Sequence, residues 1–324
     1  NGIGQFAFSA SGHLIYVSGG IAPAMESSLV RVDRKGAETE LSAPKGSYID
    51  VRVSPDGRRI AVGRRSGVNR TTDVWVIDIT TGNATRLTSD GMSGDPVWSP
   101  DGTQVLFSGG IGRTKVQSVA ADGSGSVKEL YTATTSTRAA SWSRDGRWLT
   151  SLDYYNPIFQ IWIRSMSGPG ESKRFIDSKF SLREAALSPD ARWIAYGSTE
   201  SGSEEVYVEA FPDGGTKYRI STHGGFNPVW ARNGRELYYF EGHDRKDALM
   251  ASDFSADAAV KFGTPHALFE GDWDVTTPTR SYDVTPDGDF IMSRSKFPQE
   301  PPVTKVNVVL NWFQELKQRA PVSK

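Results

Sequence analysis

Charged side chains recur at one position of a repeated segment, just before a short apolar run. Some carry carboxylates and others guanidinium groups, whose planar fork of donors suits a carboxylate or a phosphate. With neighbouring aromatic and amide residues they form a candidate binding set: Tyr48, Asp50, Asp95, Arg138, Arg183, Glu184, Phe226, Asn227, Arg280 and Tyr282. If the segments converge on one channel, the arginines predict a ligand with an anionic group, and the aspartates suit its hydroxyls or amines. The alternative is that these charges pair across the channel and hold water.

Groups typical of catalysis or metal binding are sparse. The four histidines are scattered, and the chain has no cysteine, which excludes disulfides, thiolate metal sites and a cysteine nucleophile. No Gly-x-Ser-x-Gly nucleophile elbow occurs, and the adjacent acids Glu204 and Glu205 would face opposite sides of a strand. We therefore predict no catalytic residue, no metal site and no cofactor, and favour recognition over catalysis. A hydrolase or lyase that uses the central channel is the alternative.

The overall charge narrows the class of partner. There are 37 basic and 38 acidic residues, giving a net charge of −1 without a basic block, which argues against nucleic-acid binding. No apolar run is long enough to span a membrane. The chain starts at Asn1 rather than Met, so we expect it to begin within a longer gene product. The predicted partner is a small anionic ligand, a peptide or a protein.

The elements that must position these side chains are set by a four-residue motif that recurs seven times. Its typical form is Ser-Pro-Asp-Gly, in which Pro fixes φ, Asp bonds nearby backbone and Gly accepts positive φ, so each copy predicts a turn. The copies begin at Ser9, Ser54, Ser99, Ser143, Ser188, Ala231 and Thr285. Their spacings of 45, 45, 44, 45, 43 and 54 residues are typical of a propeller rather than of a sandwich or solenoid.

Each turn lies between two β-branched or aromatic runs, and a third and usually a fourth strand follow. The fold class is therefore predicted to be all-β, a single β-propeller over residues 1–324 with seven blades of mostly four antiparallel strands. Repeats would start near residues 6, 50, 95, 139, 184, 227 and 281. Residues 29–32 and 306–309 would be the third strands of the first and last repeats. Six blades with one aberrant repeat is the alternative.

A short helix is predicted in the tail, residues 311–324. Trp312, Phe313 and Leu316 are spaced as one helical face, and we expect them to pack on the last blade and cover its edge. The antiparallel connectivity places the motif turns at one end of the channel. The loops that enter each inner strand, which carry the candidate residues, lie at the other end, and loops on a rigid scaffold often carry function.

Several stretches resemble known propeller repeats. The Trp-Ser-Pro-Asp-Gly sequence at residues 98–102 resembles TolB-like repeats. Residues 205–212, 221–225 and 308–316 are similar to the extracytoplasmic propeller regions of bacterial, often acidobacterial, serine/threonine protein kinases. The resemblance implies a sensor or protein-interaction role in the periplasm or outside the cytoplasmic membrane. No kinase motif occurs in this chain, so a kinase would lie upstream.

Overall fold

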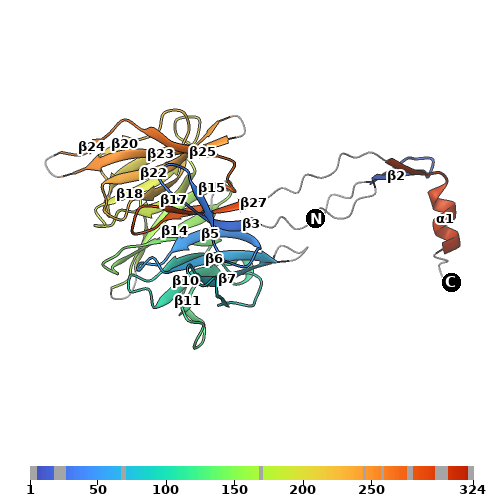
Figure 1. Ribbon diagram of the computed structural model, residues 1–324, viewed down its shortest axis with the longest axis horizontal. Helices are drawn as coiled ribbons and strands as arrows, with labels where there is room; N and C mark the ends of the chain where they lie inside the picture. Colours follow the sequence, from blue (N-terminus) through green and yellow to red (C-terminus); the bar gives the residue numbers. More distant parts are fainter. Residues whose placement is uncertain are drawn as a thin grey trace.

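The computed structural model describes residues 6–17, 27–66, 71–167, 171–243, 246–256, 259–275, 280–295 and 306–319. The described strands form seven sheets in which neighbouring strands are antiparallel, and one α-helix, α1 (Trp312–Arg319), lies near the C-terminus (Figure 1). A short 3₁₀ helix, η1 (Ile111–Arg113), joins two strands. The predicted all-β class with a short C-terminal helix is confirmed.

Five sheets are formed by segments that are consecutive in sequence, and their inner strands follow one another at the predicted spacing. The first three sheets are β5 (Ser47–Val53), β6 (Arg59–Ser66), β7 (Thr71–Asp78) and β8 (Ala84–Arg86); β9 (Gly94–Trp98), β10 (Gln104–Gly109), β11 (Lys115–Ala120) and β12 (Lys128–Thr132); and β13 (Thr137–Trp142), β14 (Trp148–Tyr155), β15 (Ile158–Ser165) and β16 (Ser172–Arg174). The next two are β17 (Leu182–Leu187), β18 (Trp193–Ser198), β19 (Glu205–Ala210) and β20 (Lys217–Arg219); and β21 (Phe226–Trp230), β22 (Glu236–His243), β23 (Lys246–Ser255), β24 (Lys261–Phe262) and β25 (His266–Gly271).

The sixth sheet joins the two ends of the chain. Its inner pair is β26 (Tyr282–Val284) and β27 (Phe290–Ser295), and its outer pair is β3 (Ser27–Val32) and β4 (Glu38–Glu40). Strand β27 pairs with β3 from Phe290 opposite Val32 to Ser295 opposite Ser27. The N-terminal segment therefore completes the last repeat.

Six hydrophobic clusters connect these six sheets in a cyclic order. Each cluster contains side chains from two neighbouring sheets, and the series returns to its start, because Leu29 and Ile291 of the sixth sheet pack with Val51 of the first. Full burial of one such side chain stabilises a fold by roughly 1.5–3 kcal/mol. The sheets thus surround a common axis, with β5, β9, β13, β17, β21 and β26 as the first strands of their sheets.

The prediction of seven blades is not confirmed, and the alternative of six agrees with the six larger sheets. Strands β1 (Phe6–Phe8) and β2 (Leu14–Val17) form a separate three-stranded sheet with β28 (Val306–Val309), which lies apart in Figure 1. The predictions that residues 29–32 and 306–309 provide the third strands of the first and last repeats are wrong, because β27 pairs with β3 and β2 pairs with β28. Seven motif copies are present, but the first lies in the three-stranded sheet, and the strands that follow it, β3 and β4, complete the sheet of the last copy.

The expected packing of the C-terminal helix on the last blade is also not observed. The Phe313 ring lies 6.3 Å from that of Phe8 in the three-stranded sheet, and the Asn311 N–H donates to His13 Nδ1 at 3.0 Å. Phe313 and Leu316 are 50% and 44% exposed. This helix therefore contacts the small sheet rather than the edge of the sixth one.

The motif turns follow the predicted chemistry. In the second copy, Ser54 Oγ donates to Asp56 Oδ1 at 2.6 Å and accepts from the Arg59 N–H at 2.9 Å, while Gly57 has a φ of 74°. Ala191, which replaces this glycine in the fifth copy, takes the same left-handed conformation, with φ 54°. The turn geometry is therefore kept at Ala191, at the cost of backbone strain in a residue with a Cβ.

A candidate binding site in the central channel

Two adjoining cavities lie along the first strands of the six sheets. The loop-side cavity, about 340 Å³, is bounded by residues near the start of these strands: Asp50, Arg52, Asp95, Arg138, Ala139, Ala140, Leu152, Glu184, Ala185, Ala186, Pro228 and Arg280. The turn-side cavity, about 690 Å³, is open to solvent near the motif turns and includes Trp98, Trp142, Arg144, Pro189, Trp230, Arg232 and Asp283. Arg52, Ala140, Ala186 and Arg280 line both, so the cavities are successive parts of one channel.

A β-bulge near the start of four inner strands places acidic or amide side chains at the loop-side end. Asp50, Asp95, Glu184 and Asn227 have φ values of 57°, 54°, 47° and 55°, and the register shifts beside each of them. A left-handed conformation costs a residue with a Cβ roughly 1–2 kcal/mol, which Asp and Asn tolerate best. The Asp95 N–H donates to Asp50 Oδ2 at 3.4 Å, so the bulge also connects neighbouring sheets.

Charges at the loop-side cavity are largely paired. The Asp95 carboxylate lies 3.1 Å from Arg113 Nη1 and 3.2 Å from Arg138 Nη1. Asp50 is 1% exposed, and burial together with the nearby charge of Asp95 raises its pKa to about 6, despite the opposing effect of the arginines. The lining contains three acids and three arginines, so this cavity is close to neutral overall.

Glu184 is buried and lies beside the partly buried Glu204. Burial and the neighbouring Glu204 raise its pKa well above the usual value, and burial also raises the pKa of Glu204. Arg183 Nη1 lies 3.3 Å from Glu204 Oε2, and the Asn227 N–H donates to Glu184 Oε2 at 3.3 Å. The two carboxyl groups are therefore held where one of them retains its proton more readily than a free glutamic acid does.

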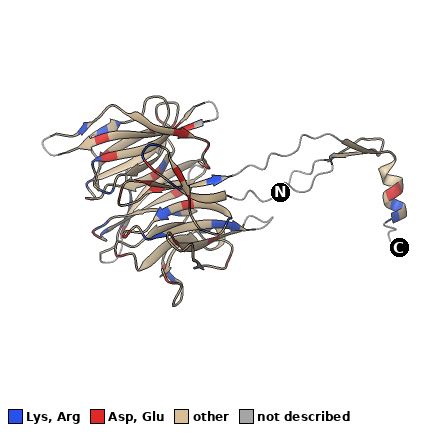
Figure 2. Ribbon diagram, in the orientation of Figure 1, with Lys and Arg blue, Asp and Glu red and all other residues tan. Residues whose placement is uncertain are grey.

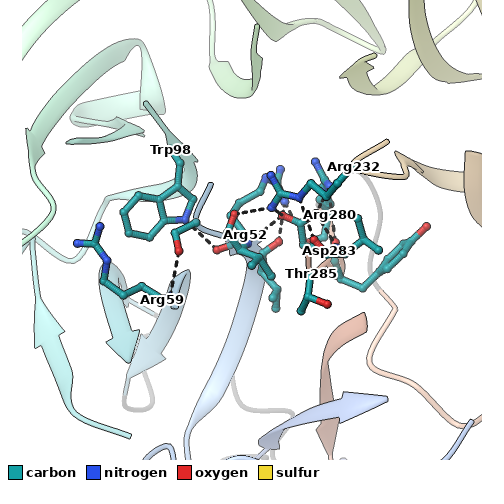
Figure 3. A network of polar contacts seen from close by, with 12 residues as sticks. Arg52, Arg59, Trp98, Arg232, Arg280, Asp283 and Thr285 are labelled. Atoms are coloured by element: carbon teal, nitrogen blue, oxygen red, sulfur yellow. Dashed lines mark hydrogen bonds and ion pairs between the residues drawn. The ribbon is translucent and has the colours of Figure 1, made fainter. Parts of the chain in front are cut away.

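Arginines dominate the turn-side cavity, where Figure 3 shows Arg52, Arg232 and Arg280 near Asp283. Arg280 forms an ion pair with Asp283, and Arg232 Nη2 lies 4.0 Å from the same carboxylate. Asp283 also accepts from the Val53 N–H at 2.8 Å. Burial, followed by the charge of Arg280, lowers the pKa of Arg52 to about 10, so the group remains a cation at neutral pH.

The indoles of the turn-side cavity are fixed by backbone acceptors. Trp98 Nε1 donates to the Arg52 carbonyl at 2.9 Å, and Trp230 Nε1 donates to the Ala186 carbonyl at 3.1 Å, each across to the preceding sheet. Trp142 Nε1 donates to the Gly146 carbonyl within its own turn at 3.1 Å. The polar edge of each ring is therefore occupied by a backbone partner.

The structure brings five of the ten candidate residues to the loop-side cavity: Asp50, Asp95, Arg138, Glu184 and Arg280. The other five lie outside its lining. Tyr48 and Tyr282 are buried in the hydrophobic clusters, and Phe226 packs against one of these and stacks on Phe240. Arg183 and Asn227 contact the Glu184 pair instead. Of the three candidate arginines, Arg138 and Arg280 line this cavity and Arg183 does not.

Sequence reasoning missed Arg52, which lines both cavities, and the roles of Arg144 and Arg232. A signal for the last two was present: the motif position that is Pro in Ser54–Gly57 is Arg in two copies. Pro189, at the same position of the fifth copy, also lines the turn-side cavity. The second residue of the motif therefore faces the channel in the fourth, fifth and sixth copies.

Two further features of the described residues bear on other functions. They contain no group of three or more His, Cys, Asp or Glu residues that could hold a metal ion. Within those same ranges, no helix is both long and apolar enough to cross a membrane. Basic and acidic residues are interspersed over the sheets (Figure 2), in line with the net charge of −1.

Comparisons with known proteins support the fold. No protein-family model matches the chain. A stretch of 160 residues, 48% of the chain, is 27% identical to a Bacillus subtilis (strain 168) protein described as the uncharacterized peptidase YuxL; the match spans only 22% of that protein. The structure is similar to TolB of Agrobacterium tumefaciens, with a TM-score of 0.67, 18% identity and coverage of 84% of this chain and 99% of that one.

Two further solved structures have the same architecture. TolB of Acinetobacter baumannii matches with a TM-score of 0.57 and 18% identity over 77% of this chain and 67% of that one. An oligogalacturonate lyase in complex with manganese matches with a TM-score of 0.52 and 14% identity over 84% of this chain and 97% of that one. At these identities the likeness shows the fold alone: this chain has the fold of a TolB-like β-propeller.

Proposed function

We propose that this protein is a non-catalytic recognition propeller that binds a small polar ligand, or the end of a peptide, in the loop-side cavity. The observation that carries the proposal is the arrangement of charged groups there. Three acids and three arginines, contributed from around the ring, line this cavity. A ligand with both donor and acceptor groups can exchange its own contacts for these ion pairs.

The buried acid Asp50 supports a binding role for the loop-side cavity, because it does not stabilise the fold at neutral pH. Asp50 sits in a strained left-handed conformation and has a raised pKa, so its ionised form costs folding free energy at neutral pH. An amine or hydroxyl of a ligand would interact favourably with this carboxylate. Strained and electrostatically costly groups gathered in one cavity are typical of binding and active sites.

The cellular setting is part of the proposal. On the resemblance of residues 308–316 to kinase-linked propellers, we place this protein outside the cytoplasmic membrane, as the sensor or protein-interaction region of a longer bacterial membrane kinase. The test fuses the full-length protein, at the end of the propeller, to a reporter enzyme that works only in the periplasm or to one that works only in the cytoplasm. Activity of the periplasmic reporter supports this placement, and activity of the cytoplasmic reporter alone would contradict it.

The test of the binding site starts with a thermal-shift screen of amino acids, short peptides and sugar acids, followed by calorimetric titration of each hit. Arg138→Ala should weaken binding roughly tenfold, because a charge-assisted hydrogen bond contributes about 1.5–3 kcal/mol. Arg192→Ala is the matched control, since Arg192 pairs with Asp190 on an exposed turn. Equal affinity in all three proteins would refute this site. Turnover of the hit, lost in Glu184→Gln, would make the cavity an active site instead.

A further inference from the structure

The turn-side cavity differs from the loop-side cavity in its charge. Four arginines, Arg52, Arg144, Arg232 and Arg280, face it, and Asp283 is the only acid among the residues that line it. Asp283 forms an ion pair with Arg280 and accepts hydrogen bonds from the Val53 and Val284 N–H groups. The cavity therefore carries uncompensated positive charge, in a protein whose net charge is −1.

Arg232 is held in place before any ligand arrives. Its Nε donates to the Val284 carbonyl at 3.1 Å and its Nη2 donates to the Val53 carbonyl at 2.9 Å, so the guanidinium spans three sheets. Backbone carbonyls fix the orientation of the group, and its ion-pair partner Asp283, 4.0 Å away, is shared with Arg280. Such pre-organisation lowers the conformational entropy that binding would otherwise cost.

Arg144 and Arg52 have donors that are not used by the protein. Within the described part of the chain, no hydrogen bond or ion pair is found for the Arg144 side chain, and partial burial together with the charge of Arg232 lowers its pKa. Arg52 is only 8% exposed, and its buried Nε has no hydrogen-bond partner. A buried donor without a partner costs about 1–3 kcal/mol, which a suitable acceptor would recover.

The walls and the opening of the cavity indicate what accompanies the anionic group. Trp98, Trp142 and Trp230 line it, and their N–H groups are already bonded to backbone carbonyls. What these indoles can offer a ligand is their carbon surface. The cavity is also open to solvent, so that an anionic group can enter it while the rest of a ligand remains outside.

We infer that the turn-side cavity is a second binding site, which takes an oxyanion, a phosphate or a carboxylate, on Arg52, Arg144 and Arg232. It lies at the opposite end of the channel from the proposed ligand site and uses different arginines, apart from the shared Arg52. Guanidinium groups bind both kinds of oxyanion through paired N–H donors. The inference goes beyond the proposed function, because the site can exist whether or not the loop-side cavity binds anything.

The test uses inorganic phosphate and citrate as probes, titrated into the whole chain at constant ionic strength and followed by tryptophan fluorescence. Saturable binding of either probe is expected, because three tryptophans line the site. Arg144→Ala should weaken it roughly fivefold, the effect of losing one partly solvated charge. Arg147→Ala is the matched control, since Arg147 lies on the same turn but is 67% exposed and pairs with Asp145.

Arg232→Lys provides a second variant that keeps the charge but not the planar fork; its melting curve shows whether the ring remains folded. If only phosphate binds, the site is assigned to phosphate groups. If both probes bind, the site is assigned to oxyanions generally. No saturable binding, or unchanged affinity in both Arg144→Ala and a folded Arg232→Lys, would overturn the inference. Arg138→Ala should leave binding of these probes unaltered, which separates this site from the loop-side cavity.

Discussion

Replacement of Asp50 by Asn should stabilise the protein at neutral pH. Asp50 is buried, and its carboxylate accepts a hydrogen bond from the Asp95 N–H, which an amide oxygen can also accept. Asn227 occupies the corresponding bulge in another sheet with φ 55°, compared with 57° at Asp50. The backbone is therefore compatible with the substitution, and the main change is the loss of a titratable group.

The magnitude follows from the raised pKa of Asp50, which is about 6 in the folded protein and 3.8 in a solvated carboxyl. A folded-state pKa above the unfolded one means that native stability falls as pH rises between the two values. At about 1.4 kcal/mol for each pH unit, the full cost above pH 7 is at most about 3 kcal/mol. Asp50→Asn removes this cost, so its stabilising effect should be near zero at pH 4 and largest at pH 7–8.

The assay is urea unfolding of wild type and Asp50→Asn at pH 4, 5, 6, 7 and 8, followed by tryptophan fluorescence. Asp95→Asn is the control, because Asp95 contacts Arg113 and Arg138. Its loss leaves two guanidinium groups without their carboxylate and should destabilise the protein. A difference between wild type and Asp50→Asn that does not change with pH, or that is destabilising at pH 8, would refute the reasoning.

Three further predictions test the fold. Ala191→Gly should raise stability by about 1 kcal/mol by relieving a left-handed φ, and Gly146→Ala, at the same turn position with open space around it, should lower it by a similar amount in urea unfolding. Trp98→Phe should lower stability by about 1–2 kcal/mol more than Trp142→Phe, because its N–H bonds across two sheets while that of Trp142 bonds within a turn. Deletion of residues 306–319 should leave the main melting transition unchanged, since β28 pairs only with β2 among the described strands; a lower melting temperature would show that the tail supports the ring.

Much of the fold was predictable because the motif turns encode it locally. Ser54 and Asp56 make the same hydrogen bonds as Ser99 and Asp101, so equal spacing of the motif implied equal sheets. The number of blades was not predictable from the same signal. Whether Ser27–Val32 pairs with β2 or with β27 depends on contacts between segments more than 250 residues apart, which local patterns do not determine.

The position of the candidate site was predictable from the sequence, but the full set of charged residues that line it was not. Counting back from each turn located Asp50, Asp95 and Arg138 at one cavity. The β-bulges, which rotate neighbouring side chains out of simple alternation, moved Tyr48 into the core while Arg52 reached the channel. Arg144 and Arg232 occupy the second position of the repeated motif and were visible in the sequence. Their role in the cavity could not be inferred without knowing that this position faces the channel in their copies.

The most direct test of the account is where a ligand binds. In protein labelled with ¹⁵N at the arginine side chains, each assigned Nε–H signal reports on one place in the fold. A ligand from the screen should shift the signals of Arg138, which lines the loop-side cavity, and of Arg113, which shares Asp95 with it, and leave that of Arg192 on an exposed turn unchanged. Shifts at Arg192 with none at Arg138 or Arg113 would contradict binding in the loop-side cavity and would place recognition elsewhere on the protein.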